Sequence, residues 1–161
     1  MSQPVPPSSG NPFAGGDQYA PAPPPAPVRN NLGLGIVVAV VTALVTAGVY
    51  GAIAGAIEAE IGYAAVGVGF LIGFAAAKVG GPNPVLAVLS ALLGVGAVYL
   101  GQLVGIAMIG AEELGLSFTD LFIDQFSLIT QAWKESADGM TYVFLAIAAV
   151  TAFGGAKKAN A

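Results

Sequence analysis

Two groups of carboxylates are the residues of this chain whose types and spacing could carry chemistry. Glu58 and Glu60 lie two positions apart between apolar stretches, and carboxylates within a membrane can bind cations or relay protons. A relay needs a basic partner, yet the chain has no His, and every Lys and Arg lies at or beyond the end of an apolar stretch. We therefore interpret the pair as the water boundary where the first apolar stretch ends.

The second group consists of Asp120 and Asp124, one helical turn apart, with Glu112 and Glu113 ahead of them. Carboxylate oxygens are the ligands that Ca²⁺ prefers. The alternating acids and central Gly of a calcium-binding loop are missing here. We interpret these acids as a solvated face and predict no metal site.

The absence of Cys and His removes most catalytic templates. Without Cys there is no disulfide, thiol nucleophile or thiolate metal site, and without His the commonest general base is missing. Gly67-Val-Gly69 has the glycines of a phosphate loop but no Lys-Ser or Lys-Thr after them. The sequence predicts a protein that is not an enzyme and needs no cofactor, and its net charge of -4 argues against a nucleic-acid partner.

The elements that hold these residues are unusually apolar. Hydrophobic residues make up 56% of the chain and charged residues 9%, whereas a soluble domain carries about 25% charged residues. Stretches of this length without charges are typical of transmembrane helices. The sequence predicts an all-α fold in the lipid bilayer, with a membrane domain at 32–157 and four spans at about 34–57, 61–79, 85–110 and 139–156.

The charges sort by sign between these spans. Basic residues flank one set of span ends and acidic residues the other: Arg29, Lys78, Lys157 and Lys158 against Glu58, Glu60 and the acids of 112–138, with Lys134 as the exception. Basic residues concentrate on the cytoplasmic side of membrane proteins. The sorting predicts a multi-pass plasma-membrane protein with both termini in the cytoplasm.

Residues 1–31 differ in composition from the rest. The run Pro21-Ala-Pro-Pro-Pro-Ala-Pro27, together with several Gly and Ser, favours extended, solvated chain. Such a segment has little to bury, so we predict a disordered, proline-rich cytoplasmic tail. A competing interpretation makes the first apolar stretch a late signal segment cleaved near Ala52-Ile-Ala54, although the long tail before it is untypical of a signal.

Residues 117–136 carry apolar side chains at three- and four-residue spacings. This pattern predicts an outer amphipathic helix. One interpretation lays this helix in the lipid–water interface on the outer side of the membrane, with Trp133 at headgroup depth. The other packs it over the outer ends of the bundle. The sequence does not separate the two.

Small residues recur at every fourth position of three spans, where they would line grooves that let helices approach closely. The predicted helix-packing residues are Ala43, Ala47, Gly51 and Gly55 in the first span, Gly69 and Gly73 in the second, and Gly101 and Gly105 in the third. Packing within the bundle explains them. A homo-oligomer or a surface for another membrane protein is the alternative.

The motif Glu60-Ile-Gly-Tyr63, followed by Val66-Gly-Val-Gly-Phe-Leu-Ile-Gly73 and the break Lys78-Val-Gly-Gly81, resembles a widespread family of small bacterial integral membrane proteins with four spans. The bias toward Pro, Ala, Gly and Val is similar to proteins of actinobacteria. The resemblance covers about 34–153 and implies a four-span topology with a variable cytoplasmic tail. It implies no activity and no site residues.

Two functions agree with these patterns. The preferred one is a non-enzymatic accessory or scaffold component of a plasma-membrane complex, with the tail or the small-residue faces engaging a partner. The alternative is a small oligomeric channel or transporter whose acidic outer face concentrates cations. A channel needs a polar path, and within the spans the sequence offers only Tyr99, Gln102, Thr42 and Thr46.

Overall fold

The computed structural model describes residues 30–59 and 61–161, and no strand occurs among them. The predicted all-α class is confirmed. The tail predicted at 1–31 lies outside the described residues apart from Asn30 and Asn31, and Glu60 lies outside them too.

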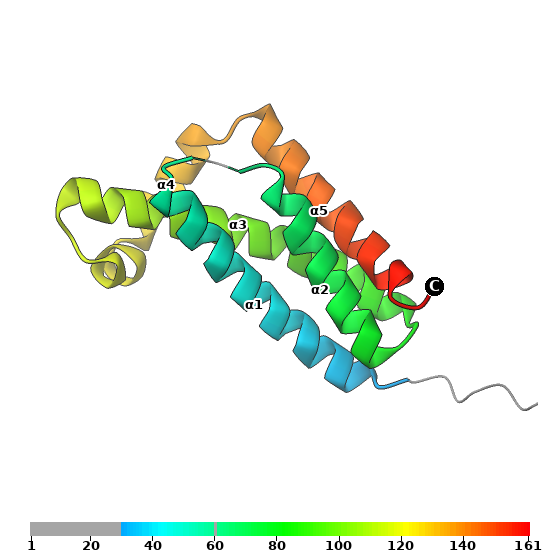
Figure 1. The fold of residues 1–161 in the computed structure, drawn as a ribbon. Helices are drawn as coiled ribbons and strands as arrows, with labels where there is room; N and C mark the ends of the chain where they lie inside the picture. The colour runs from blue at the N-terminus through cyan, green and yellow to red at the C-terminus, as the bar shows by residue number, and fades with distance from the viewer. Residues whose placement is uncertain (1–29, 60) are drawn as a thin grey trace, which may run out of the picture.

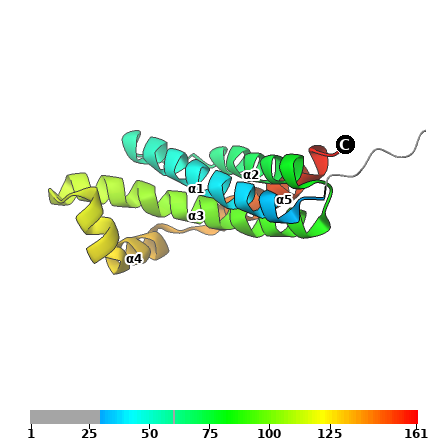
Figure 2. The same ribbon diagram turned by 90° about the horizontal axis from the view of Figure 1, so that it is seen from below.

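Four long helices run side by side, and two short helical segments lie beside one end of them (Figures 1 and 2). The bounds are α1 Leu32–Ala56, α2 Ala64–Gly80, α3 Pro84–Leu114, the π-helical turn η1 Asp120–Asp124, α4 Phe126–Ser136 and α5 Gly139–Lys158. The chain passes along the bundle alternately in each direction, so α1 and α3 are parallel, as are α2 and α5.

The helix ends fall where the sequence supplies caps and breaks. The side chain of Asn83 accepts a hydrogen bond from Val85 N at 2.9 Å, and Pro84 occupies the first turn of α3. Both are favoured helix starts. Gly81 ends α2 with φ 87° and Gly115 ends α3 with φ 64°, a backbone region that favours glycine.

The interior of the bundle is built mainly from Ala and Gly. Ala39, Ala47 and Ala76 are completely buried, while large aliphatic residues such as Leu44 (58% exposed) and Val45 (59% exposed) point outward. A water-soluble helix bundle places its large apolar side chains inside. The reverse arrangement suits a lipid surrounding, where close packing of small residues holds helices together.

Three helices, α1, α3 and α5, are long and apolar enough to cross a membrane. The fourth apolar helix, α2, has 17 residues, or about 25 Å at about 1.5 Å per residue, which is shorter than the hydrocarbon core of about 30 Å. Apolar helices compatible with a membrane protein are therefore observed.

The segment predicted as one amphipathic helix at 117–136 is divided. The turn η1 ends at Asp124, and α4 begins at Phe126. Gln125 between them has φ -120° and ψ 30°, which depart from helical values. The helix α3 continues to Leu114, beyond the membrane span predicted at about 85–110. No residue before Gly115 stops the helix, and Glu112 and Glu113 are good helix formers.

Candidate functional site

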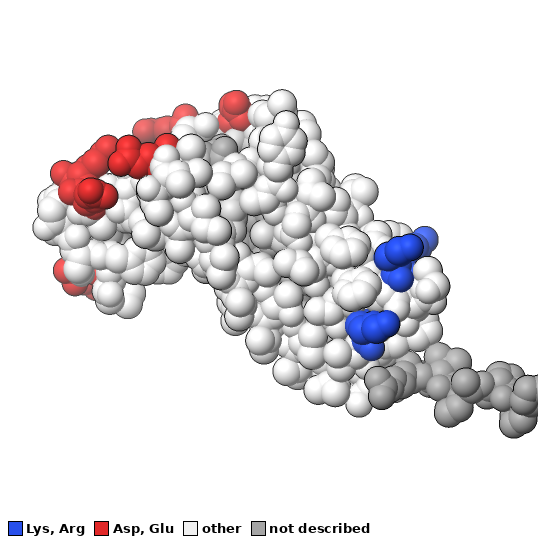
Figure 3. Space-filling model, viewed as in Figure 1, with Lys and Arg blue, Asp and Glu red and all other residues white. Residues whose placement is uncertain are grey.

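Acidic and basic side chains gather at opposite ends of the bundle (Figure 3). Lys78, Lys157 and Lys158 lie at the end where α2 and α5 finish. Carboxylates cover the other end, where α1 and α3 finish and where η1 and α4 lie. Within the described ranges, Lys134 on α4 is the one base outside the basic end.

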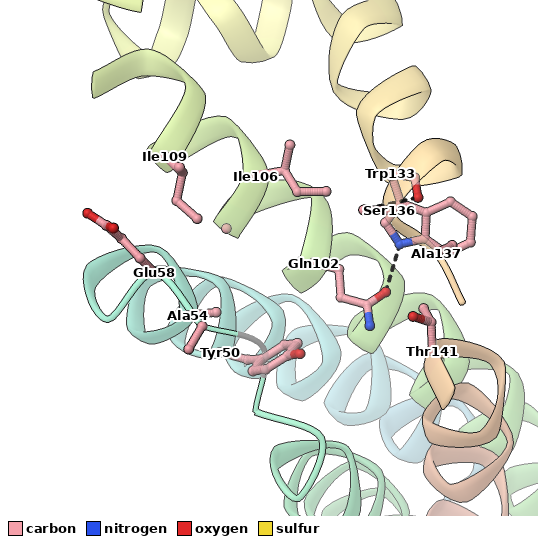
Figure 4. Close-up of a pocket in the computed structure, with 12 residues that line it drawn as sticks. Tyr50, Ala54, Glu58, Gln102, Ile106, Ile109, Trp133, Ser136, Ala137 and Thr141 are labelled. Atoms are coloured by element: carbon pink, nitrogen blue, oxygen red, sulfur yellow. Dashed lines mark hydrogen bonds between the residues drawn. The ribbon is translucent and has the colours of Figure 1, made fainter. Parts of the chain in front are cut away.

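A cavity of about 200 Å³ opens at the acidic end, between α1, α3 and the segment that joins α4 to α5 (Figure 4). Its lining is mostly apolar with a few polar side chains: Tyr50, Ala54, Glu58, Ala59, Gln102, Gly105, Ile106, Ile109, Trp133, Ser136, Ala137 and Thr141. A concave, mainly apolar site with a few converging polar groups is typical of ligand pockets. We call it the acidic-end pocket.

Trp133 closes one side of this pocket. Its indole Nε1 donates a hydrogen bond of 2.8 Å to Oε1 of Gln102 on α3, and its ring makes edge contacts with Tyr99 and Tyr142. Ile129, one turn earlier on the same face of α4, is buried against α3 residues. Trp133 thus holds α4 against the bundle. The interpretation that places Trp133 at headgroup depth did not predict this contact.

Thr141 lies near Trp133 in the pocket wall (Figure 4) and belongs to the cap of α5. The backbone N–H of Thr141 donates to Oδ1 of Asp138 at 2.8 Å, and its hydroxyl donates to the same oxygen at 3.0 Å. The backbone hydrogen bond from Thr141, and after it the side-chain bond, hold the pKa of Asp138 below its ordinary value of 3.8. This capping box fixes the start of α5 beside the pocket.

Glu58 stands at the open rim. It is exposed, and Figure 4 shows its carboxylate pointing away from the pocket interior. Its φ of 51° is a left-handed value that a residue other than Gly adopts rarely. The chain turns sharply there, directly after α1. Glu60, the other acid of the predicted pair, lies outside the described residues.

The small residues predicted in the first and third spans lie where α1 meets α3. Ala43 and Ala47 are buried. A Cβ on Gly51 would meet the side chain of Val104 and the carbonyl of Gly101 at about 2.6 Å or less, and one on Gly55 would meet Met108 Cβ at 2.8 Å.

The same interface includes the two predicted glycines of α3. A Cβ on Gly101 would collide with the ring of Tyr50, so this position requires glycine. Gly105 is less crowded, since a Cβ there would lie 3.4 Å from Ala54 Cβ, an ordinary contact.

The predicted small residues of the second span, Gly69 and Gly73, face α5. A Cβ on either would run into backbone carbonyls, that of Ala148 for Gly69 and that of Ala152 for Gly73. The sequence prediction did not include α5. A signal was present, because Ala148, Ala152 and Ala156 repeat at every fourth position and are all buried.

The acids considered as calcium ligands do not form a site. Within 30–59 and 61–161, no group of three or more acids is placed to hold a metal ion. The pocket itself was not predicted, because Gln102 and Trp133 are 31 residues apart in the sequence. No family model, curated protein or solved structure matched the chain when it was compared with them.

Proposed function

We propose that the chain is a four-span integral protein of the plasma membrane, with the basic end in the cytoplasm and the acidic end outside. The fourth span in this proposal is α2. Its 17 helical residues are preceded by the partly buried Ile61 and Gly62, which lengthen the apolar segment toward the thickness of the hydrocarbon core.

Two features support this topology. The outward faces of the long helices carry Val, Leu and Ile, which would be costly in water over so large an area. The Lys residues and the carboxylates occupy opposite ends (Figure 3), as the rule that basic residues remain in the cytoplasm requires.

Within the membrane we propose a non-enzymatic role as an accessory or scaffold component of a larger complex. The observation that carries this proposal is the closed interior. Among the described residues, the buried polar side chains are Ser90, Gln102 and Thr141, and Ala and Gly fill most of the space between helices. A protein that conducts ions through its own bundle needs a continuous polar path.

Residues 117–136, the outer segment, add surface through which an accessory or scaffold protein could contact its complex. Phe118, Phe122 and Phe126 form a row of ring contacts, and Ile123 is 70% exposed. We propose that this row lies in the lipid–water interface on the outer side of the plasma membrane, with the neighbouring acids facing water. Aromatic and aliphatic side chains are favoured at that depth.

Native mass spectrometry after purification in mild detergent tests the accessory role. We expect the full chain to be recovered with a stoichiometric partner of different sequence. A variant lacking residues 2–28 but keeping Arg29 should insert normally and lose that partner if the tail is the ligand. A chain recovered only with copies of itself, which also conducts cations in liposomes, would contradict the proposal and establish the channel alternative.

A further inference from the structure

The polar groups inside the acidic-end pocket are engaged with protein atoms. The Trp133 indole is bonded to Gln102, the Thr141 hydroxyl to Asp138, and the Ser136 hydroxyl to the carbonyl of Trp133. What the pocket presents to a ligand is therefore mostly apolar surface from Ile106 and Ile109, beside two aromatic residues. The described residues of its lining include one charged group, Glu58 at the rim.

We propose that this pocket binds a small organic cation, an ammonium group on a short apolar body. The body would enter between Tyr50, Ile106 and Trp133, and the ammonium would stay at the rim beside Glu58. The side chain of Glu58 is exposed, and because its carboxylate points away from the interior in Figure 4, it must rotate about its side-chain bonds to meet the ammonium. An ammonium is attracted by a carboxylate, and an apolar body packs favourably against aromatic side chains.

The size of the pocket limits the ligand. Its volume is about 200 Å³, and an apolar protein cavity of about 150 Å³ holds a benzene molecule. A benzene ring with a two-carbon ammonium arm is thus of the right size. A long acyl chain is not.

The charges around the pocket select the sign of the ligand. The acidic end carries Glu58 just after α1 and Glu112 and Glu113 near the end of α3. Figure 3 shows carboxylates gathered at this end, and they raise the local concentration of cations. No Lys or Arg lines the pocket in the described part of the chain. A phospholipid headgroup brings a phosphate next to its ammonium, and here that phosphate would find no basic partner. The pocket therefore favours a free amine over a lipid headgroup.

The single Trp of the chain, Trp133, reports on binding because it lines the pocket. The probe is 2-phenylethylammonium, titrated into the full-length protein in a neutral maltoside detergent while indole fluorescence is recorded. We expect a saturable change. The uncharged 2-phenylethanol, which has the same body, should bind about fivefold more weakly, because it forms no ion pair with a partly solvated carboxylate.

Two matched pairs of variants locate the site. Glu58→Gln should weaken binding of 2-phenylethylammonium about fivefold, whereas Glu112→Gln removes a charge at the same end without touching the pocket and should change it little. Ile109→Phe should fill the cavity and abolish saturation. Ile123→Phe, at an exposed position, should not. Thermal melting of each variant shows that it is folded.

Three results would overturn the proposal. The first is equal affinity for the amine and the alcohol, and the second is a Glu58→Gln variant that binds as tightly as the original chain. The third is displacement of the amine by lysophosphatidylethanolamine at equal concentration, which would assign the pocket to a lipid headgroup. None of these results depends on whether the chain has a partner in the membrane.

Discussion

At the scale of single residues, the bond between Trp133 and Gln102 joins the outer segment to the bundle. Gln102 is 7% exposed on α3, and a buried amide without a partner would be costly. The Trp133 indole supplies a donor at 2.8 Å, and its ring makes edge contacts with Tyr99 and Tyr142. This contact, together with the burial of Ile129 against α3, holds α4 in place and with it one wall of the pocket.

A double-mutant cycle measures the contribution of the bond. Gln102→Leu and Trp133→Phe should each destabilise the protein, and together they should show a coupling free energy of about 1 kcal/mol, the usual value for such a hydrogen bond. Reversible unfolding in mixed micelles gives the four stabilities. Gln131→Leu, which removes an exposed bond to Glu135, serves as the control. Additive effects of the two changes would show that the bond does not hold α4.

The cap of α5 predicts a dependence on pH. Because the pKa of Asp138 is lower in the folded protein than its ordinary 3.8, its ionised form stabilises the fold at pH values above 3.8, and this stabilisation is lost as the pH falls through the lower folded pKa. Asp138→Asn keeps an acceptor but does not titrate.

Thermal melting of both proteins from neutral to acid pH isolates this effect, because the other carboxylates titrate alike in each. The original chain should melt higher at neutral pH, and the difference should shrink at the acid end. A difference that stays constant over the whole range would show that the Asp138 charge does not stabilise the cap.

At the scale of elements, the repeats of small residues predicted that helices pack closely but not which helices pair. The recurrence at every fourth position identified Gly51 and Gly73 from the sequence as positions that line a groove. That Gly51 meets α3 and Gly73 meets α5 depends on how the bundle closes, and a repeat on one helix carries no information about its partner. The break at Gln125 was also not predictable, since no Pro or Gly marks it.

Matched glycine substitutions test this packing. Gly51→Leu, Gly55→Leu and Gly73→Leu should destabilise the bundle by about 1–3 kcal/mol or more, because a large side chain there would overlap the neighbouring helix. Gly48→Leu should be tolerated, since no atom lies within 4 Å of a Cβ at that position.

Leu44→Ala, at an exposed site, should also cost little. Melting temperatures in detergent give the ranking. If Leu44→Ala or Gly48→Leu proved as damaging as Gly51→Leu, the assignment of inner and outer faces would be wrong.

At the scale of the whole molecule, the separation of charges organises the structure. The sequence alone predicted it, because the signs alternate between apolar stretches, and the folded helices bring like charges to the same end (Figure 3). The acidic-end pocket could not be predicted from the sequence. It is formed by residues of α1, α3, α4 and α5 and of the segments next to them, which are far apart in the sequence.

Labelling of single cysteines in intact cells tests the membrane topology most directly. The chain has no Cys, so Lys78→Cys and Asp124→Cys each introduce one reactive thiol, at the basic and the acidic end. An impermeant thiol reagent should label position 124 in intact cells and position 78 only after permeabilisation. Labelling at 78 and not at 124 in intact cells would reverse the orientation, and labelling of both would contradict the four-span membrane topology.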